Sequence, residues 1–162
     1  MARPNPIRSI MESELPSLTY QRKLGFRPSV RETRDAYRTL NRYLFDNRLK
    51  MPEIQQGTIR QCWGYCQWQD DRQDSGSYCT IKLMDKWFAP QWWLNTLAHE
   101  MVHQWQWDII GMKERGGDYE KRGGAHGPDF FQFREVFDYY GLHLKTSHGM
   151  KRWFRHQDFT RC

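Results

Sequence analysis

The residues His99-Glu100-Met101-Val102-His103 have the types and the spacing of a site for metal-assisted hydrolysis. On a helix, side chains four residues apart lie on the same face, about one turn apart, so both imidazoles can reach one tetrahedral ion. Glu100 is rotated by about 100° from His99, which places its carboxylate near the ion without binding it. A carboxylate there can act as general base for a water molecule. We therefore expect one zinc ion, with Glu100 as the catalytic base.

A catalytic zinc site usually takes three ligands from the protein, so a third must come from elsewhere in the chain. His126 is favoured because Gly127 and Pro128 follow it and fix its position at the start of a helix. Acidic third ligands stay open as alternatives, namely Glu114, Asp118 and Glu120. The remaining histidines lack metal-ligand spacing and are interpreted as surface residues or residues behind the ligands; they are His143, His148 and His156.

The histidine pair falls inside a predicted helix that begins at Pro90, runs through Trp107 and ends near Gly111. Upstream, β-branched and aromatic residues predict strands over Thr58–Trp68 and Tyr78–Leu83, joined by a polar turn as a hairpin. We expect the strand that ends at Leu83 to offer an edge to which an extended substrate adds by backbone pairing.

Two further helices are predicted around the hairpin. Ser29 and Glu32 form a capping box, and apolar residues then recur at helical spacing to about Asn47. Pro128 opens the other helix, whose apolar face extends to Tyr140. These elements indicate an α+β domain in which a small antiparallel sheet packs on the active-site helix and on flanking helices.

Length and composition fit one domain of 162 residues whose core draws on many aromatic side chains. No apolar run approaches the roughly 20 residues that a membrane helix needs, and no signal-peptide core is visible. We expect a monomer without membrane association, cytoplasmic or else nuclear or nucleoid-associated. The four cysteines lack the paired spacing of a zinc cluster and are expected to be reduced thiols.

The formal net charge of +6 is concentrated at the two ends of the chain. Residues 3–42 hold nine basic and four acidic residues, and residues 145–161 hold five and one. Candidate phosphate contacts are the arginine stripe of the first predicted helix and three residues of the C-terminal tail: Arg31, Arg34, Arg38, Arg42, Lys151, Arg152 and Arg155. A solvated basic surface without a nucleic-acid partner is the alternative.

The histidine motif, a glycine-rich gap and His126-Gly127-Pro128-Asp129-Phe130 together resemble the SprT-like metallopeptidase family, which includes the Spartan DNA–protein crosslink proteases. The similarity covers roughly Val30 to Leu144 and includes Gly64-Tyr65-Cys66 and Cys79-Thr80-Ile81-Lys82-Leu83 in the strand pair. It implies a single zincin-like metallopeptidase domain over residues 28–144, between a basic N-terminal arm (1–27), which we predict to be extended, and a basic C-terminal tail (145–162). It also implies three zinc-binding histidines, His99, His103 and His126.

The implied function is that of a zinc-dependent endopeptidase acting on DNA-associated or DNA-crosslinked proteins. Its partners would be a protein substrate and DNA, either single-stranded or crosslinked. No paired cysteines follow His126, so the zinc ribbon of several family members has no counterpart in this sequence. One alternative stays open, a zinc-stabilised nucleic-acid-binding module without turnover. A peptide deformylase would need an upstream cysteine ligand, and the surroundings of Cys79, the nearest upstream cysteine, do not match that motif.

Overall fold

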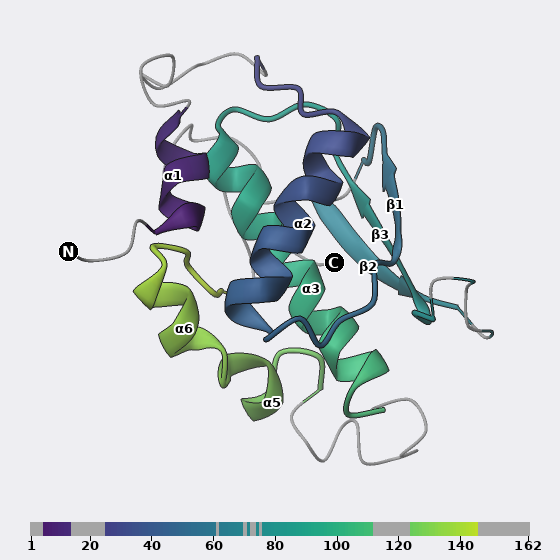
Figure 1. The fold of residues 1–162 in the computed structure, drawn as a ribbon. Helices are drawn as coiled ribbons and strands as arrows, with labels where there is room; N and C mark the ends of the chain where they lie inside the picture. Colours follow the sequence, from purple (N-terminus) through teal and green to yellow (C-terminus); the bar gives the residue numbers. More distant parts are fainter. Residues whose placement is uncertain are drawn as a thin grey trace.

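The computed structural model describes residues 5–13, 25–60, 62–69, 71, 74, 76–111 and 124–145. Helices α2 (Val30–Leu44) and α3 (Pro90–Asp108) lie side by side on one face of a small sheet (Figure 1). Helix α1 (Pro6–Ser13) packs on α2 and α3, while α5 (Pro128–Phe131) packs on α3 and is followed by α6 (Arg134–Tyr139). The predicted α+β class is confirmed.

The described residues form a three-stranded sheet in the order β1-β3-β2, from β1 (Glu53–Gln56), β2 (Gly64–Trp68) and β3 (Cys79–Leu83). Strands β2 and β3 pair antiparallel as predicted, but β1 pairs parallel with β3, so the sheet is mixed rather than antiparallel. Because β3 is paired on both sides, the prediction that it offers an edge to the substrate is wrong. In the described part of the chain the outer strands are β1 and β2.

The side chains of the sheet alternate between a helix-covered face and a more polar one. Ile54 and its cross-strand partner Ile81 are buried beneath the helices together with Leu83. Their neighbours Glu53 and Gln55 are exposed, as the two-residue period of a strand requires. Three short strands can form a stable sheet here because their apolar face packs against two long helices.

Helix α2 begins as the sequence predicts. The Ser29 hydroxyl accepts a hydrogen bond from the Glu32 N–H (3.1 Å), and the Glu32 carboxylate accepts one from the Ser29 N–H (2.7 Å). The helix ends at Leu44, three residues before the predicted end, because Asp46 and Asn47 adopt positive φ angles of 53° and 58°. These angles are incompatible with a continuing right-handed helix.

Helix α3 is the central element of the fold. Every residue from Trp93 to Gln106 is buried, so the helix is enclosed on nearly all sides rather than along one stripe. It contacts β2, β3, α2, α1 and α5. The predicted start at Pro90 is confirmed, and the histidine motif therefore lies within the buried part of this helix.

Two sequence-based predictions of secondary structure are corrected. Residues 6–13 of the expected extended arm are helical, because Asn5 accepts hydrogen bonds from the N–H groups of Ile7 (3.1 Å) and Arg8 (3.0 Å) and Ile7 is fully buried. Near the C terminus the single predicted helix is interrupted at Gln132 and Phe133, which separate α5 from α6.

The cysteines also depart partly from expectation. Cys66 and Cys79 are free thiols, as predicted. Cys62 is disulfide-bonded, so the expectation of reduced thiols is wrong at that position.

Candidate metal centre

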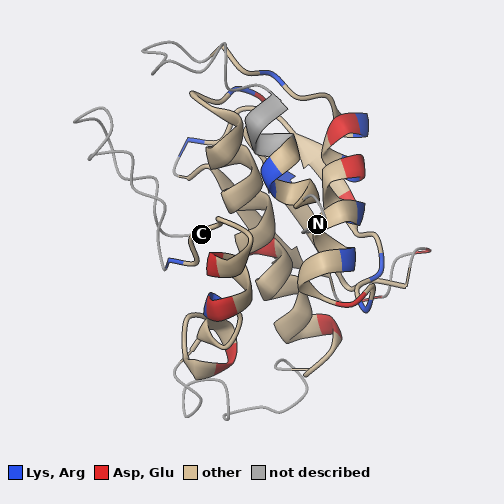
Figure 2. Ribbon diagram, turned by 60° about the vertical axis from the view of Figure 1, so that its left-hand side comes forward, with Lys and Arg blue, Asp and Glu red and all other residues tan. Residues whose placement is uncertain are grey.

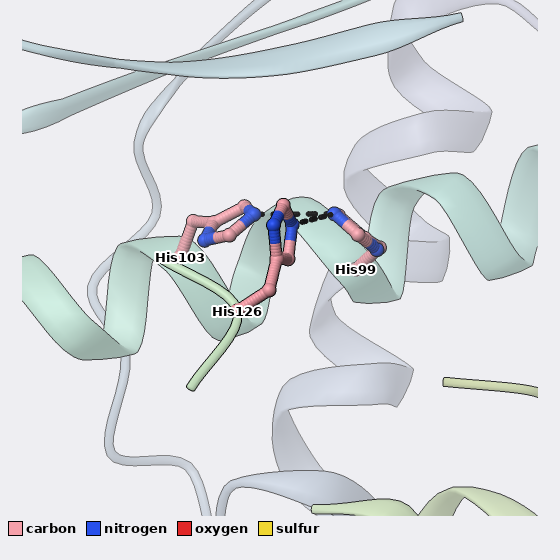
Figure 3. A group of neighbouring side chains, drawn as sticks. All are labelled: His99, His103 and His126. Carbon is pink, nitrogen blue, oxygen red and sulfur yellow. Dashed lines mark hydrogen bonds between the residues drawn. The ribbon is translucent and has the colours of Figure 1, made fainter. Parts of the chain in front are cut away.

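Three histidines converge at one point beside α3. His99 and His103 come from successive turns of this helix, and His126 reaches them from the turn that precedes α5 (Figure 3). The Nε2 atom of His99 lies 3.1 Å from Nε2 of His103 and 3.3 Å from Nε2 of His126. One ligand atom from each residue lies within 4.8 Å of the others, and no other such group of metal-ligating side chains occurs among the described residues.

These spacings fit a tetrahedral ion. Zinc binds imidazole nitrogens at about 2.0–2.1 Å, so two nitrogens at tetrahedral positions are about 3.3 Å apart. The observed separations of 3.1 and 3.3 Å are close to this value. Imidazole nitrogens suit zinc, whereas harder cations such as Mg²⁺ or Ca²⁺ prefer oxygen ligands. The donor set therefore fits zinc in both geometry and chemistry.

The protein holds two of these imidazoles, His103 and His126, in the form that a metal requires. His103 is buried, and its burial lowers the pKa to about 4, with the neighbouring His126 acting in the same direction. Burial also lowers the pKa of the half-buried His126. Both rings are consequently neutral near pH 7, and a neutral imidazole has a nitrogen lone pair to donate.

The aromatic ring of Phe130 packs against all three imidazole rings. Its ring centroid lies 4.9 Å from those of His99 and His103 and 4.8 Å from that of His126, and its side chain is fully buried. Because Phe130 is on α5, it packs the turn that bears His126 against α3. The aromatic ring thus fixes the spacing between the two parts of the chain that supply the imidazoles.

Glu100 is buried next to the histidines, with 2% of its surface exposed. Its Oε2 atom is buried without a hydrogen-bond partner in the described structure. Burial raises the pKa of Glu100 well above its ordinary value, and the nearby backbone N–H of Cys66 opposes this rise. A buried carboxylate oxygen without a partner is costly unless a further group, such as a water molecule, meets it there.

The remaining predicted residues are distributed elsewhere. Four arginines are exposed along α2, where basic and acidic residues alternate (Figure 2): Arg31, Arg34, Arg38 and Arg42. His143 is exposed and is not part of the histidine group. Other predicted residues lie outside the described part of the chain, namely Lys151, Arg152, Arg155, His148, His156 and the alternative ligands Glu114, Asp118 and Glu120.

The ligand set of the peptide deformylase alternative is not found among the described residues. The histidine group contains no cysteine, and the Cys79 thiol instead lies 3.9 Å from Oδ1 of Asp108, at the far end of α3. Sequence reasoning also missed two contacts of the site. They are the Cys66 N–H, a backbone group that residue types do not reveal, and Gln106, whose position three residues after His103 was the available signal.

An α+β fold with three convergent histidines and an adjacent buried glutamate on one helix defines a metallopeptidase-like domain. The sequence model of the SprT-like family matches residues 33–148, which is more than two thirds of the chain. This chain belongs to the SprT-like family. Neither the curated proteins nor the solved structures give a match. Among the described residues, no helix combines the length and the apolar character needed to cross a bilayer.

Proposed function

We propose that this protein is a zinc-dependent endopeptidase of SprT-like type that acts on DNA-associated or DNA-crosslinked proteins. The observation that carries the proposal is the convergence of three imidazole Nε2 atoms beside a buried glutamate whose Oε2 has no partner in the described structure. His99, His103 and His126 would hold the ion. Zinc bound there supplies a Lewis acid that polarises a peptide carbonyl and lowers the pKa of water.

Glu100 supplies the proton transfers in this proposal. Oε2 of its carboxylate is buried without a partner in the described structure, and we infer that it takes the proton of the attacking water. Because burial raises the pKa of this carboxyl group, the group holds the proton long enough to deliver it to the leaving amine. One residue therefore acts first as a base and then as an acid.

The outer edge of β2 is where we expect the substrate backbone to bind. The Trp63 carbonyl accepts from the Met84 N–H, and the Gln69 N–H donates to the Tyr78 carbonyl, so the odd-numbered residues of this segment pair with the β3 side. The even-numbered residues direct their backbone groups the other way, and the Cys66 N–H is close enough to Glu100 to lower its pKa. An extended chain pairing along this edge would lie beside Glu100 and would be read through backbone groups, which favours broad sequence specificity.

The proposed action on DNA-associated proteins rests on charge. Four arginines are exposed on α2, and one of them, Arg38, forms an ion pair with Asp35 at 2.8 Å. Such a solvent-exposed pair is weak and can yield to a phosphate group. The same surface also supports a second candidate function, a zinc-stabilised nucleic-acid-binding module without turnover.

The decisive experiment measures cleavage of a protein crosslinked to single-stranded DNA and of the same protein without DNA. We expect cleavage that stops on chelation, returns with zinc, and falls by about 10²–10⁴-fold in Glu100→Gln. The variant should retain one zinc per chain, because Glu100 is not a ligand. Zinc and DNA binding without cleavage of either substrate would favour the binding module, and full activity in Glu100→Gln would remove Glu100 from the mechanism.

A further inference from the structure

Gln106 connects the two segments that supply the histidines. Its amide is buried on α3, 2% exposed, one turn beyond His103. Oε1 lies 2.8 Å from Nδ1 of His103, and Nε2 donates to the carbonyl oxygen of Ala125 at 2.8 Å. Ala125 immediately precedes His126 in the chain. One side chain therefore contacts a candidate ligand directly and the backbone next to another.

The contact with Ala125 determines which way the amide points. A backbone carbonyl only accepts hydrogen bonds, so the group that faces it must be the NH₂ of Gln106. The oxygen of the amide then faces His103, and since this oxygen only accepts, Nδ1 of His103 carries the hydrogen. The other ring nitrogen, Nε2, is left with its lone pair toward His99 and His126.

The same contact restrains the position of His126. The turn around it is short, with the Gly127 N–H donating to the Gly124 carbonyl (3.3 Å) and Gly124 at a φ of 70°. Phe130 holds this turn from the C-terminal side, and Gln106 holds it from the N-terminal side through Ala125. Without Gln106, the carbonyl of Ala125 would lose this hydrogen bond, which also ties the turn to α3.

We propose that Gln106 is a positioning residue of the metal centre, which fixes the tautomer of His103 and docks the His126 turn on α3. This inference deepens the proposed function, since it takes the three histidines to be the metal ligands. Groups behind a metal ligand commonly contribute about 10–100-fold to metal affinity. In this chain a single amide positions two of the three candidate ligands, so its removal should weaken the binding of zinc by both.

The test is zinc affinity, measured by competition with a chromophoric chelator on the full chain. Gln106→Met keeps the length of the side chain but removes both hydrogen bonds, and we expect affinity to fall about 10–100-fold. The control is Gln104→Met, on the same helix. Gln104 is also buried, but its amide bonds Tyr37 (2.8 Å) and the Lys50 carbonyl (2.7 Å), away from the histidines. This variant should lower thermal stability and leave zinc affinity unchanged.

Gln106→Glu separates the two contacts. A carboxylate still accepts from Nδ1 of His103 but repels the Ala125 carbonyl, so only the docking of His126 is removed. In the His126→Ala background, adding Gln106→Glu should not lower zinc affinity further, because the docking that it removes no longer matters. Adding Gln106→Met should still lower zinc affinity, because it also removes the hydrogen bond to His103. If Gln106→Met fails to fold, Gln106→Glu alone, with and without His126→Ala, still tests the docking of the His126 turn.

Two results would overturn the inference: wild-type zinc affinity in Gln106→Met and Gln106→Glu, or equal losses of affinity in Gln104→Met. All measurements are repeated with Glu100→Gln present, so that they do not depend on proteolysis. If the Gln106 variants lose zinc affinity but the wild-type protein cleaves no substrate, the positioning role of Gln106 is supported and the proposed endopeptidase activity is rejected. If the wild-type protein cleaves its substrate but the Gln106 variants keep wild-type zinc affinity, the endopeptidase activity is supported and the role of Gln106 is rejected.

Discussion

The backbone N–H of Cys66, on the outer strand β2, lies close enough to Glu100 on α3 to lower the pKa of its carboxyl group. The acidity of the proposed catalytic base therefore depends on the distance between a strand and a helix. That distance is set at Gly64, where a Cβ atom would lie 2.7 Å from Cδ2 of Leu83 and 2.9 Å from Cγ2 of Thr96. Only glycine lets β2 approach α3 this closely.

Gly64→Ala should separate β2 from α3. Overpacking of this kind costs about 1–3 kcal/mol of stability, and the shift withdraws the Cys66 N–H from Glu100. We expect a lower melting temperature together with a lower kcat, while zinc content is retained. Gly57→Ala is the matched control, because the nearest atom to its Cβ, Cε of Lys82, is at 4.0 Å. Unchanged stability and kcat in Gly64→Ala would show that the close approach does not constrain the strand.

His126→Ala should lose most of the affinity for zinc, since two imidazoles on one helix leave a catalytic site one protein ligand short. The measurement is metal content after dialysis against a weak chelator. His143→Ala is the control, because that side chain is exposed outside the histidine group. Full zinc retention in His126→Ala would point to an acidic third ligand from Glu114, Asp118 or Glu120.

Glu32→Gln tests the capping box of α2 through its pH dependence. Hydrogen bonds with Ser29 lower the pKa of Glu32 below its ordinary value of 4.5. A carboxylate with a lowered pKa stabilises the fold above the unfolded value, and this contribution disappears as the pH falls through the folded value. For an exposed group we expect about 0.5 kcal/mol or less at pH 7.

The measurement is the difference in melting temperature between wild type and Glu32→Gln from about pH 7 to about pH 2.5. The wild type should be the more stable protein at pH 7, and the two should converge in acid. Ser29→Ala, which removes the side-chain cap, should cost about 1 kcal/mol at pH 7. A difference that grows as the pH falls would contradict the assignment.

The arginine face of α2 is tested by replacing Arg31, Arg34, Arg38 and Arg42 together with glutamine. We expect weaker binding of single-stranded DNA and a salt dependence reduced by about 0.7 in log–log slope for each phosphate group that the variant no longer neutralises. Arg48→Gln combined with Arg134→Gln is the control, since both residues are exposed outside this helix. Cleavage of a substrate without DNA should be unaffected. DNA affinity that does not change would assign these arginines to a solvated surface.

The sequence predicts helix α3, which carries two of the candidate ligands, well because its signals are local. Pro90 marks the start, and the spacing of His99 and His103 determines that both share one face of the helix. His126 could be placed near them because Gly127 and Pro128 restrict the chain around it. Ser29 and Glu32 predict the start of α2 for the same reason, as each contacts the backbone of the other within one turn.

The parts that could not be predicted depend on contacts between distant segments. Strand β1 reads Glu-Ile-Gln-Gln and has little apolar pattern; it exists because it pairs in parallel with β3, which lies far along the chain. Pairing with β1 places β3 at the centre of the sheet. The sequence therefore could not show that β3 has no free edge. Gln106 and the Cys66 N–H likewise acquire their roles only when α3 meets other segments.

The enclosure of α3 ties the metal centre to the hydrophobic core. Leu94, Leu97 and Met101 are fully buried on the same helix that carries His99 and His103, so the helix cannot turn without disrupting their packing. A cavity at any of these positions would tilt the imidazoles before it unfolded the domain. Loss of metal should therefore precede loss of structure in core variants, and evolution cannot relax the packing of this helix without also relaxing its hold on the ion.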